Sequence, residues 1–206
     1  MKAAIAALTI ITAATVGVHA RTVADLFKSA PEKAIPMLKP SARFDMVEYY
    51  KAGMNNPTKN AFDGNSRIVK ADDSVIDIEL SSKSSLQIAA VPIKADTILA
   101  VVETVLTPIP DSGLRFYRTD TWEEIVVPQL PGVAQFIDPD SAKVANKKNM
   151  PEMVFVSISY VPEENVFRFA NNTEAFYTDA DKPDGLDIMR KSIDLRFDGK
   201  KWKEKR

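Results

Sequence analysis

The sequence contains no cysteine and a single histidine, His19. His19 lies in an N-terminal segment that we expect to be removed, which would leave the mature chain without thiol or imidazole groups. These absences exclude Ser-His-Asp and Cys-His catalysis, zinc sites built on those groups, and haem or iron–sulfur ligation by them. Carboxylate, lysine, tyrosine and serine chemistry remains, together with an all-oxygen calcium or magnesium site. We predict neither a cofactor nor a bound metal ion.

Residues 1–20 have the pattern of a secretory signal peptide. Lys2 supplies a positive charge, residues 3–18 form a mostly apolar run, and the stretch VGVHA up to Ala20 resembles an Ala-x-Ala cleavage site. This pattern predicts cleavage after Ala20. The run is too short and too rich in alanine for a permanent membrane span, and no cysteine follows it to carry a lipid anchor. We therefore expect a periplasmic or secreted protein that does not span a membrane after cleavage.

Removal of residues 1–20 from the 206-residue chain leaves 186 residues, which is enough for one domain over residues 21–206. The full chain carries 27 basic and 28 acidic residues, and the two signs are intermixed. This balance favours neither nucleic acid nor an anionic membrane as a partner. Because the chain cannot form disulfides, burial of apolar surface must stabilise the fold by itself.

Residues 22–54 are expected to form short helices separated by prolines. Thr22 is the candidate N-cap of the first helix, and Asp25 lies at the position that nearly completes a capping box. Ser41 is the candidate N-cap of the next helix, which is expected to end near Gly53. The sequence therefore predicts a helical part at the start of the mature chain.

Three residues of the second helix, Phe44, Val47 and Tyr50, recur at three-residue spacing. Such a stripe predicts a helix face packed against a sheet. The alternative interpretation is a ligand-binding face lined by aromatic side chains.

From residue 74 onwards the pattern changes from helical to strand-like. Apolar and polar residues alternate first, and the following stretches are apolar on both faces. The expected strands cover residues 74–80, 84–93, 97–107 and 114–118, followed by hairpins at 154–176 and at Asp198-Gly199. Residues 54–66 are predicted to be a polar loop and residues 122–150 an irregular excursion. The predicted fold class is α+β, with short N-terminal helices packed on a mainly antiparallel, meander-like β-sheet.

Three strand-like stretches hold an arginine between two apolar residues, and the arginines are Arg115, Arg168 and Arg196. In a strand each arginine points away from the face of its two neighbours. If the three strands shared one sheet in register, their guanidinium groups could bind a carboxylate or phosphate ligand. The alternative, which we favour, is that each stem covers the sheet while the head group meets water or a cross-strand acid. Available acids include Asp77, Glu79 and Asp194.

Two further patterns are weaker candidates for chemistry. Glu103 lies on an apolar strand, but the sequence supplies no second carboxylate for a hydrolase, so pairing with a lysine or arginine is favoured. The aspartates at 179, 181 and 184 approach the ligand spacing of a calcium loop. The third aspartate falls one position late, and Arg190 occupies the position of the closing glutamate, so a polar turn is favoured.

Several segments resemble exported Bacteroidales proteins of the family called domain of unknown function 3256. The segments are TVADLFKSAPEKAIPML, ARFDMVEYYKAGM, DSVIDIELSSKSSLQIAAVP, ILAVVETVLTPIPDSGLRFYRTDTW and IDLRFDGKKW. The resemblance spans nearly the whole mature chain and is most specific in the fourth segment. It implies a Gram-negative envelope setting, and it carries no activity, cofactor or site residue.

That setting implies a possible modification, because Bacteroidales glycosylate exported proteins at Asp-(Ser/Thr)-apolar triplets. Triplets of this form contain Ser74, Thr97 and Ser141. Ser141 lies in the irregular region and is the one that we expect to be accessible, whereas the other two adjoin strands.

Taken together, these features favour a non-enzymatic exported envelope protein that acts in binding or assembly, with an envelope protein or a glycan as partner. The first alternative is a periplasmic carrier of a lipid or other apolar ligand, held between the sheet and the Phe44/Val47/Tyr50 helix. The second alternative is a carboxylate-dependent hydrolase.

Overall fold

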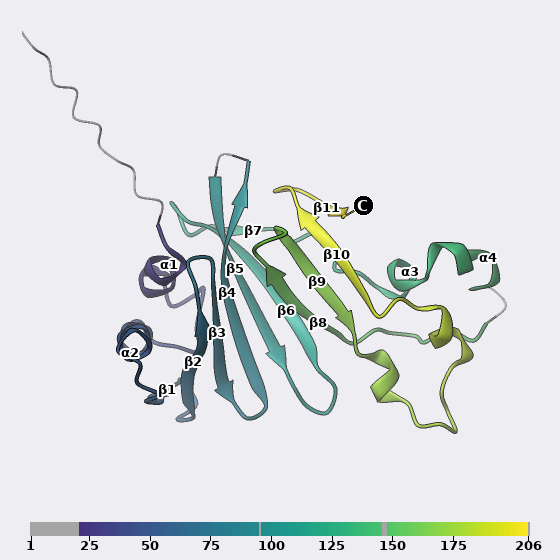
Figure 1. Ribbon diagram of the computed structural model, residues 1–206, viewed down its shortest axis with the longest axis horizontal. Coiled ribbons are helices and arrows are strands. Elements are labelled where there is room, and N and C mark those ends of the chain that lie inside the picture. Colours follow the sequence, from purple (N-terminus) through teal and green to yellow (C-terminus); the bar gives the residue numbers. More distant parts are fainter. Residues whose placement is uncertain (1–20, 95, 146–147, 206) are drawn as a thin grey trace, which may run out of the picture.

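The computed structural model describes residues 21–94, 96–145 and 148–205 (Figure 1). The predicted signal peptide, with His19, lies outside these residues. The fold is α+β, as predicted. Helices lie against one face of a seven-stranded antiparallel sheet, and a four-stranded antiparallel sheet lies against its other face.

The first helix, α1 (Val23–Ser29), begins as predicted. The Thr22 hydroxyl accepts the N–H of Asp25 at 3.2 Å, and the Asp25 carboxylate bonds back to Thr22, which completes a capping box. The second helix, α2 (Pro40–Lys51), begins one residue before the predicted cap Ser41. Proline suits the first helical position because it needs no N–H partner there. Gly53 follows α2 with φ +68°, a conformation that favours glycine.

The predicted buried stripe of α2 is wrong. Val47 is buried, but Phe44 is 54% exposed and lies under the Lys28 ammonium group, 5.8 Å from its ring centre. The face that packs inward instead contains Met46, Val47 and the fully buried Arg43. The Arg43 guanidinium donates to the carbonyl of Phe27 at 2.7 Å and so ties α2 to the end of α1, and burial lowers the pKa of Arg43.

The large sheet is a meander in which each strand pairs with the next along the chain. Its strands are β1 (Thr58–Lys59), β2 (Asn65–Ala71), β3 (Val75–Ser81), β4 (Ser84–Ile93), β5 (Asp96–Val105), β6 (Asp111–Arg118) and β7 (Glu124–Ile125). The strands β3 to β6 match the predicted ones within a few residues. The short β1 and the longer β2 contradict the prediction of a polar loop over residues 54–66 followed directly by the strand at 74.

The small sheet follows an irregular segment, as predicted. After β7, the described residues of that segment form three short helices: α3 (Val133–Phe136), η1 (Pro139–Ser141) and α4 (Ala142–Ala145). The sheet has the order β11-β10-β9-β8, with β8 (Val156–Val161), β9 (Val166–Asn171), β10 (Ser192–Phe197) and β11 (Trp202–Glu204). Two 3-10 helices, η2 (Thr173–Phe176) and η3 (Asp184–Ile188), lie between β9 and β10.

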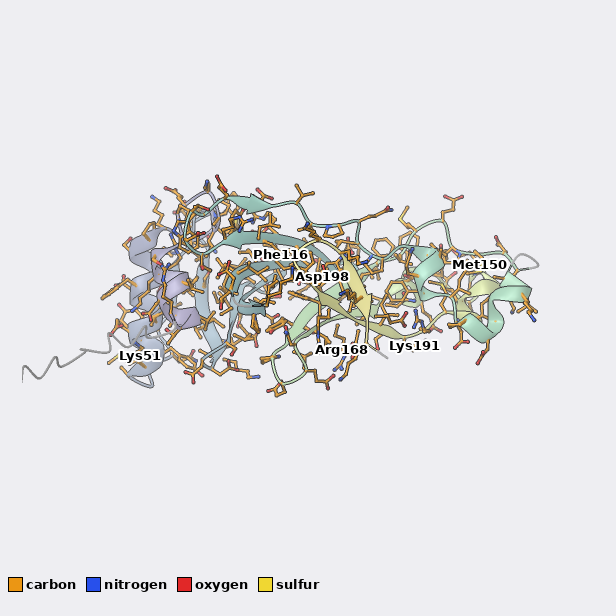
Figure 2. All side chains as sticks on the ribbon, turned by 90° about the horizontal axis from the view of Figure 1, so that it is seen from above. Lys51, Phe116, Met150, Arg168, Lys191 and Asp198 are labelled. Atoms are coloured by element: carbon orange, nitrogen blue, oxygen red, sulfur yellow. The ribbon has the colours of Figure 1, made fainter. Side chains whose placement is uncertain are left out.

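The large sheet buries side chains on both of its faces, so the fold has two hydrophobic cores. One lies between the helices and the large sheet, and the other lies between the two sheets. On β5, Leu99 and Val101 pack toward the helices, whereas Ala100 and Val102 pack toward the small sheet. The core between the sheets is aromatic. Figure 2 places Phe116 in the middle of the molecule, where its ring stacks on Phe197 at 4.5 Å between ring centres.

The β8 edge of the small sheet is hydrogen-bonded to side chains of the large sheet. Three of its backbone N–H groups donate to polar side chains of β4 and β6 rather than to another strand. The pairs are Val156 with Asp111 at 2.9 Å, Ile158 with Ser112 at 3.0 Å, and Tyr160 with Gln87 at 2.6 Å. These bonds satisfy an edge that would otherwise be open to pairing.

Candidate binding surface

The outer edge of β2 is an open strand edge of the large sheet, and it lies beside a groove. The neighbouring β1 pairs with β2 only through Thr58 opposite Ser66 and Lys59 opposite Asn65. Beyond Ser66, no strand lies against this edge within the described residues. At the opposite border of the large sheet, β6 pairs with β7 and contacts β8 of the small sheet. That border is therefore covered, whereas the β2 edge beyond Ser66 is open.

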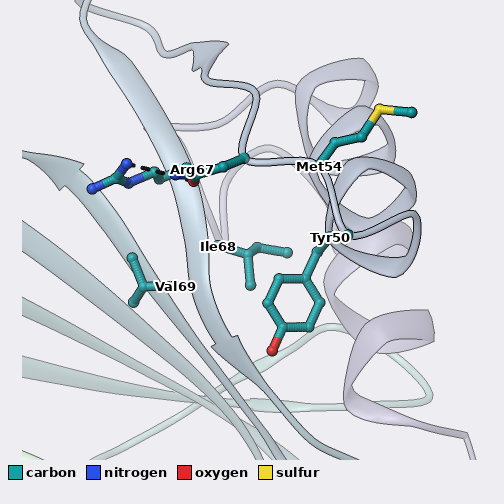
Figure 3. Close-up of a pocket in the computed structure, with 7 residues that line it drawn as sticks. Tyr50, Met54, Arg67, Ile68 and Val69 are labelled. Carbon is teal, nitrogen blue, oxygen red and sulfur yellow. Dashed lines mark hydrogen bonds between the residues drawn. The ribbon is translucent and has the colours of Figure 1, made fainter.

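A groove of about 380 Å³ runs between the free part of β2 and the end of α2 (Figure 3). The residues that line it are Tyr50, Gly53, Met54, Asn55, Arg67, Ile68 and Val69. The Tyr50 hydroxyl accepts the N–H of Ala71 at 3.1 Å and closes one end of the edge. Met54 and Val69 are 53% and 52% exposed, so the groove offers apolar surface next to free main-chain groups.

A β-bulge shapes this edge. The register between β2 and β3 shifts between Ile68 and Lys70, which leaves Val69 as the extra residue. In Figure 3 the Ile68 side chain points toward Tyr50, whereas Arg67 points away from α2. The two faces of the edge therefore differ, with apolar groups toward the helix and charged groups on the other side.

The charged face of β2 is basic and is backed by acids on β3. Arg67 lies opposite Glu79 and donates to its carboxylate from Nε at 3.0 Å and from Nη2 at 2.8 Å. Its Nη1 donates to the Asn55 side-chain oxygen at 3.4 Å, on the groove side. Lys70 is exposed and lies opposite Asp77. The outermost row of charge on this face is thus positive.

A second groove, of about 360 Å³, lies on the other side of Val69. It runs over the polar face of β3 and β4 toward β8, and Leu106 and Ser159 contribute to its walls. Since Val69 borders both grooves, the two form neighbouring hollows on either side of the β2 edge.

The three predicted arginines do not lie in one sheet. Arg115 is on β6 of the large sheet, where it donates to Glu103 at 2.6 Å. Arg168 and Arg196 are on β9 and β10 of the small sheet. Arg168 forms two parallel bonds to Asp194, at 2.9 and 2.8 Å. The hydrogen bond from Arg168 is the main reason that the pKa of Asp194 is lowered.

Arg196 differs from the other two because it binds backbone carbonyls. It donates to the carbonyls of Asn165 and Glu164 at 3.2 and 3.0 Å, which fixes the turn between β8 and β9. Each arginine therefore has a partner inside the fold, and a ligand-binding role for them stays a prediction.

The remaining candidates lie apart from the β2 edge. Glu103 is the ion-pair partner of Arg115, in agreement with the favoured pairing. The Asp181 carboxylate accepts a hydrogen bond from the Thr178 hydroxyl, and this bond is the main cause that lowers the pKa of Asp181. The Asp184 carboxylate accepts the N–H of Asn149 at 2.8 Å. Within the described residues, no cluster of three or more acidic or histidine side chains could hold a metal ion.

Ser141 ends η1 and is half-buried, with its N–H donating to the carbonyl of Asp138 at 2.9 Å. Its glycosylation stays a prediction. In the part of the chain that the structure describes, no helix is long and apolar enough to cross a membrane.

Comparison with known proteins places the chain in a family. Residues 15–202 match the family described as "Protein of unknown function (DUF3256)". The chain belongs to this family. A solved structure, a domain of an uncharacterized protein from Porphyromonas gingivalis W83, has the same fold as this DUF3256 protein. The TM-score is 0.67 at 17% sequence identity, over 89% of this chain and 97% of the other. No curated protein is similar to it in sequence.

Sequence reasoning missed the β2 edge of this DUF3256 protein, because it predicts a loop over residues 54–66 and no strand over residues 67–73, whereas β2 spans Asn65–Ala71. One signal was present. The stretch Arg-Ile-Val-Lys-Ala at 67–71 contains two adjacent β-branched residues and lies between Gly64 and a pair of aspartates, which is typical of a short strand. The bulge and the groove depend on packing against α2, and no local pattern indicates them.

Proposed function

We propose that this protein is an exported, non-enzymatic envelope protein that acts by binding another macromolecule at the β2 edge. The signal-like composition of residues 1–20 supports the export part of this proposal. The observation that carries the binding role is the unpaired edge of β2, which lies beside an open groove with exposed apolar side chains.

Open strand edges are avoided or covered in most proteins, because they pair with other chains. Here the β8 edge and one border of the large sheet are covered, whereas the edge beyond Ser66 is not. A retained edge next to a groove is the arrangement by which many domains bind an extended segment of a partner.

The competing functions have less support in the geometry. A carrier would need space between α2 and the sheet, but Met46, Val47 and the sheet side chains Ile76 and Ile78 fill that layer. A carboxylate hydrolase would need a free acid, but the Glu103 carboxylate is already bound by Arg115. Surface recognition therefore fits the described residues best.

The proposal is tested with purified protein that begins at Arg21. Turnover is measured on panels of glycan, ester and peptide substrates for the wild type and for Glu103→Gln. We expect no turnover by either protein. A turnover that Glu103→Gln abolishes would overturn the proposal in favour of the hydrolase. Native mass spectrometry checks the carrier, since a co-purified lipid of fixed stoichiometry would contradict the proposal as well. Osmotic-shock fractionation of the native host checks the envelope setting.

A further inference from the structure

The β2 edge has a charge pattern that selects among possible occupants. Residues directly opposite each other on neighbouring strands share a face of the sheet, so Arg67 and Lys70 lie on the same face as Glu79 and Asp77. From β3 to β2 this face changes from acidic to basic. A strand that continues the sheet would next meet the two basic residues.

A second copy of the chain is a poor occupant for this reason. Antiparallel pairing of two β2 edges about a two-fold axis between Ile68 and Val69 would set Arg67 opposite Lys70 of the second copy. Like charges directly opposite each other destabilise a strand pair.

We propose that the β2 edge binds an extended peptide segment of a partner protein with acidic and apolar residues in alternation. This inference rests on the proposed binding function. The peptide pairs through its main chain with the free groups between Arg67 and Val69. Its acidic side chains lie on the face of Arg67 and Lys70, and its apolar side chains lie on the opposite face, in the groove with Tyr50 and Met54.

Two features of the site fit this occupant in detail. The Arg67 guanidinium already donates to the Asn55 amide oxygen at 3.4 Å, a long bond to a neutral acceptor. A carboxylate from the peptide would form a shorter, charge-assisted bond at the same position. The edge from Arg67 to Ala71, whose last N–H is bound by Tyr50, is about 17 Å long at about 3.3 Å per residue, so a peptide of about five residues can lie along it.

The probe is a peptide with the sequence Glu-Val-Glu-Val-Glu, acetylated and amidated at its ends. It is titrated into ¹⁵N-labelled protein that begins at Arg21, and backbone amide shifts are followed by NMR. We expect the shifts to concentrate between Arg67 and Ala71. A Lys-Val-Lys-Val-Lys peptide should bind at least about 10-fold more weakly, because its charges repel the basic row. A version of the acidic peptide with N-methylated backbone should not bind, because it cannot donate main-chain hydrogen bonds.

A pair of matched variants tests the role of the edge charge. Lys70→Glu should weaken the binding of the acidic peptide by about 3- to 10-fold and strengthen that of the lysine peptide. Lys200→Glu makes the same charge change at an exposed position in the β10–β11 turn and should leave both affinities unchanged. If Lys70→Glu does not fold, the three peptides decide the question on the wild type.

Equal binding of the acidic and basic peptides, shifts that lie away from Arg67 to Ala71, or no binding at all would overturn this inference. The turnover assay on the wild type and Glu103→Gln is independent of these peptide results. It therefore tests the non-enzymatic function separately from the peptide specificity. Turnover abolished by Glu103→Gln would refute that function even if the peptide bound.

Discussion

The contact between the two sheets gives a direct test of how the layers are joined. Gln87 on β4 accepts the N–H of Tyr160 at 2.6 Å and donates from its amide nitrogen to Asp77 at 2.8 Å. The substitution Gln87→Leu keeps a side chain of similar size but removes both bonds. The Tyr160 N–H then lies on the edge of β8 without an acceptor, in a residue that is 4% exposed. Leaving a buried donor unsatisfied costs about 1–3 kcal/mol of the free energy of unfolding.

For a chain of this size, about 1 kcal/mol corresponds to about 2–4 °C in Tm, so a loss of about 1–3 kcal/mol in Gln87→Leu should lower Tm by about 2–12 °C. The assay is thermal and urea unfolding followed by circular dichroism, together with hydrogen exchange of the Tyr160 amide. Gln129→Leu is the matched control, because Gln129 makes no side-chain hydrogen bond among the described residues. The reasoning would be refuted if the two variants unfolded alike and the Tyr160 amide kept its wild-type protection.

Three further predictions concern other parts of the fold. Phe116→Ala should lower the free energy of unfolding by about 3–5 kcal/mol in urea titrations, because the ring is fully buried at the centre of the aromatic core. Gly185→Ala should lower it by about 1–3 kcal/mol, because the added Cβ would lie 2.7 Å from the Asn149 backbone oxygen, which cannot move aside as a flexible side chain can. The hydrogen bond from Lys203 is the main cause that lowers the pKa of Asp198 to about 2. The folded-state pKa is below the unfolded value, so the Asp198 carboxylate stabilises the fold above pH ~4 and loses this effect as the pH falls toward 2.

Each of these predictions has a control on the same scale. Phe62→Ala, at a position that is 76% exposed, should change the free energy of unfolding by no more than about 0.5 kcal/mol. Gly113→Ala places its Cβ in open space and should be tolerated better than Gly185→Ala. Asp198→Asn should match the wild type at pH 2 and differ from it at pH 7. A constant difference over that range would contradict the assigned pKa.

Local sequence patterns predicted the parts of the fold that depend on local physics. The capping box at Thr22 is a contact between residues three apart, so the sequence carries all of its information. The alternation that predicted β3 and the apolar stretches that predicted β4 and β5 have the same character, because a strand buried on one or both faces shows that burial in its own residues.

The errors arise where tertiary contacts decide. The three-residue spacing of Phe44 and Val47 predicts both on the inner face of α2. The packing of α2 on the sheet instead buries Val47 and leaves the Phe44 ring exposed under Lys28. The three arginines share one local pattern and still divide between two sheets, with Arg115 in one and Arg168 in the other. No local pattern states which sheet a strand joins, and the open edge of β2 depends on the same long-range information.

The sequential order of the large sheet has a consequence for how the chain acquires its structure. Every strand from β1 to β7 pairs with its neighbour in the chain, and the core beneath the helices uses buried residues only from Val23 to Tyr117. Short-range pairing of this kind closes quickly because little loop entropy is lost at each step. Residues up to Tyr117 can thus complete the hydrophobic layer beneath the helices before β8 folds. The small sheet, from β8 onwards, can then pack on the other face of a large sheet that is already formed.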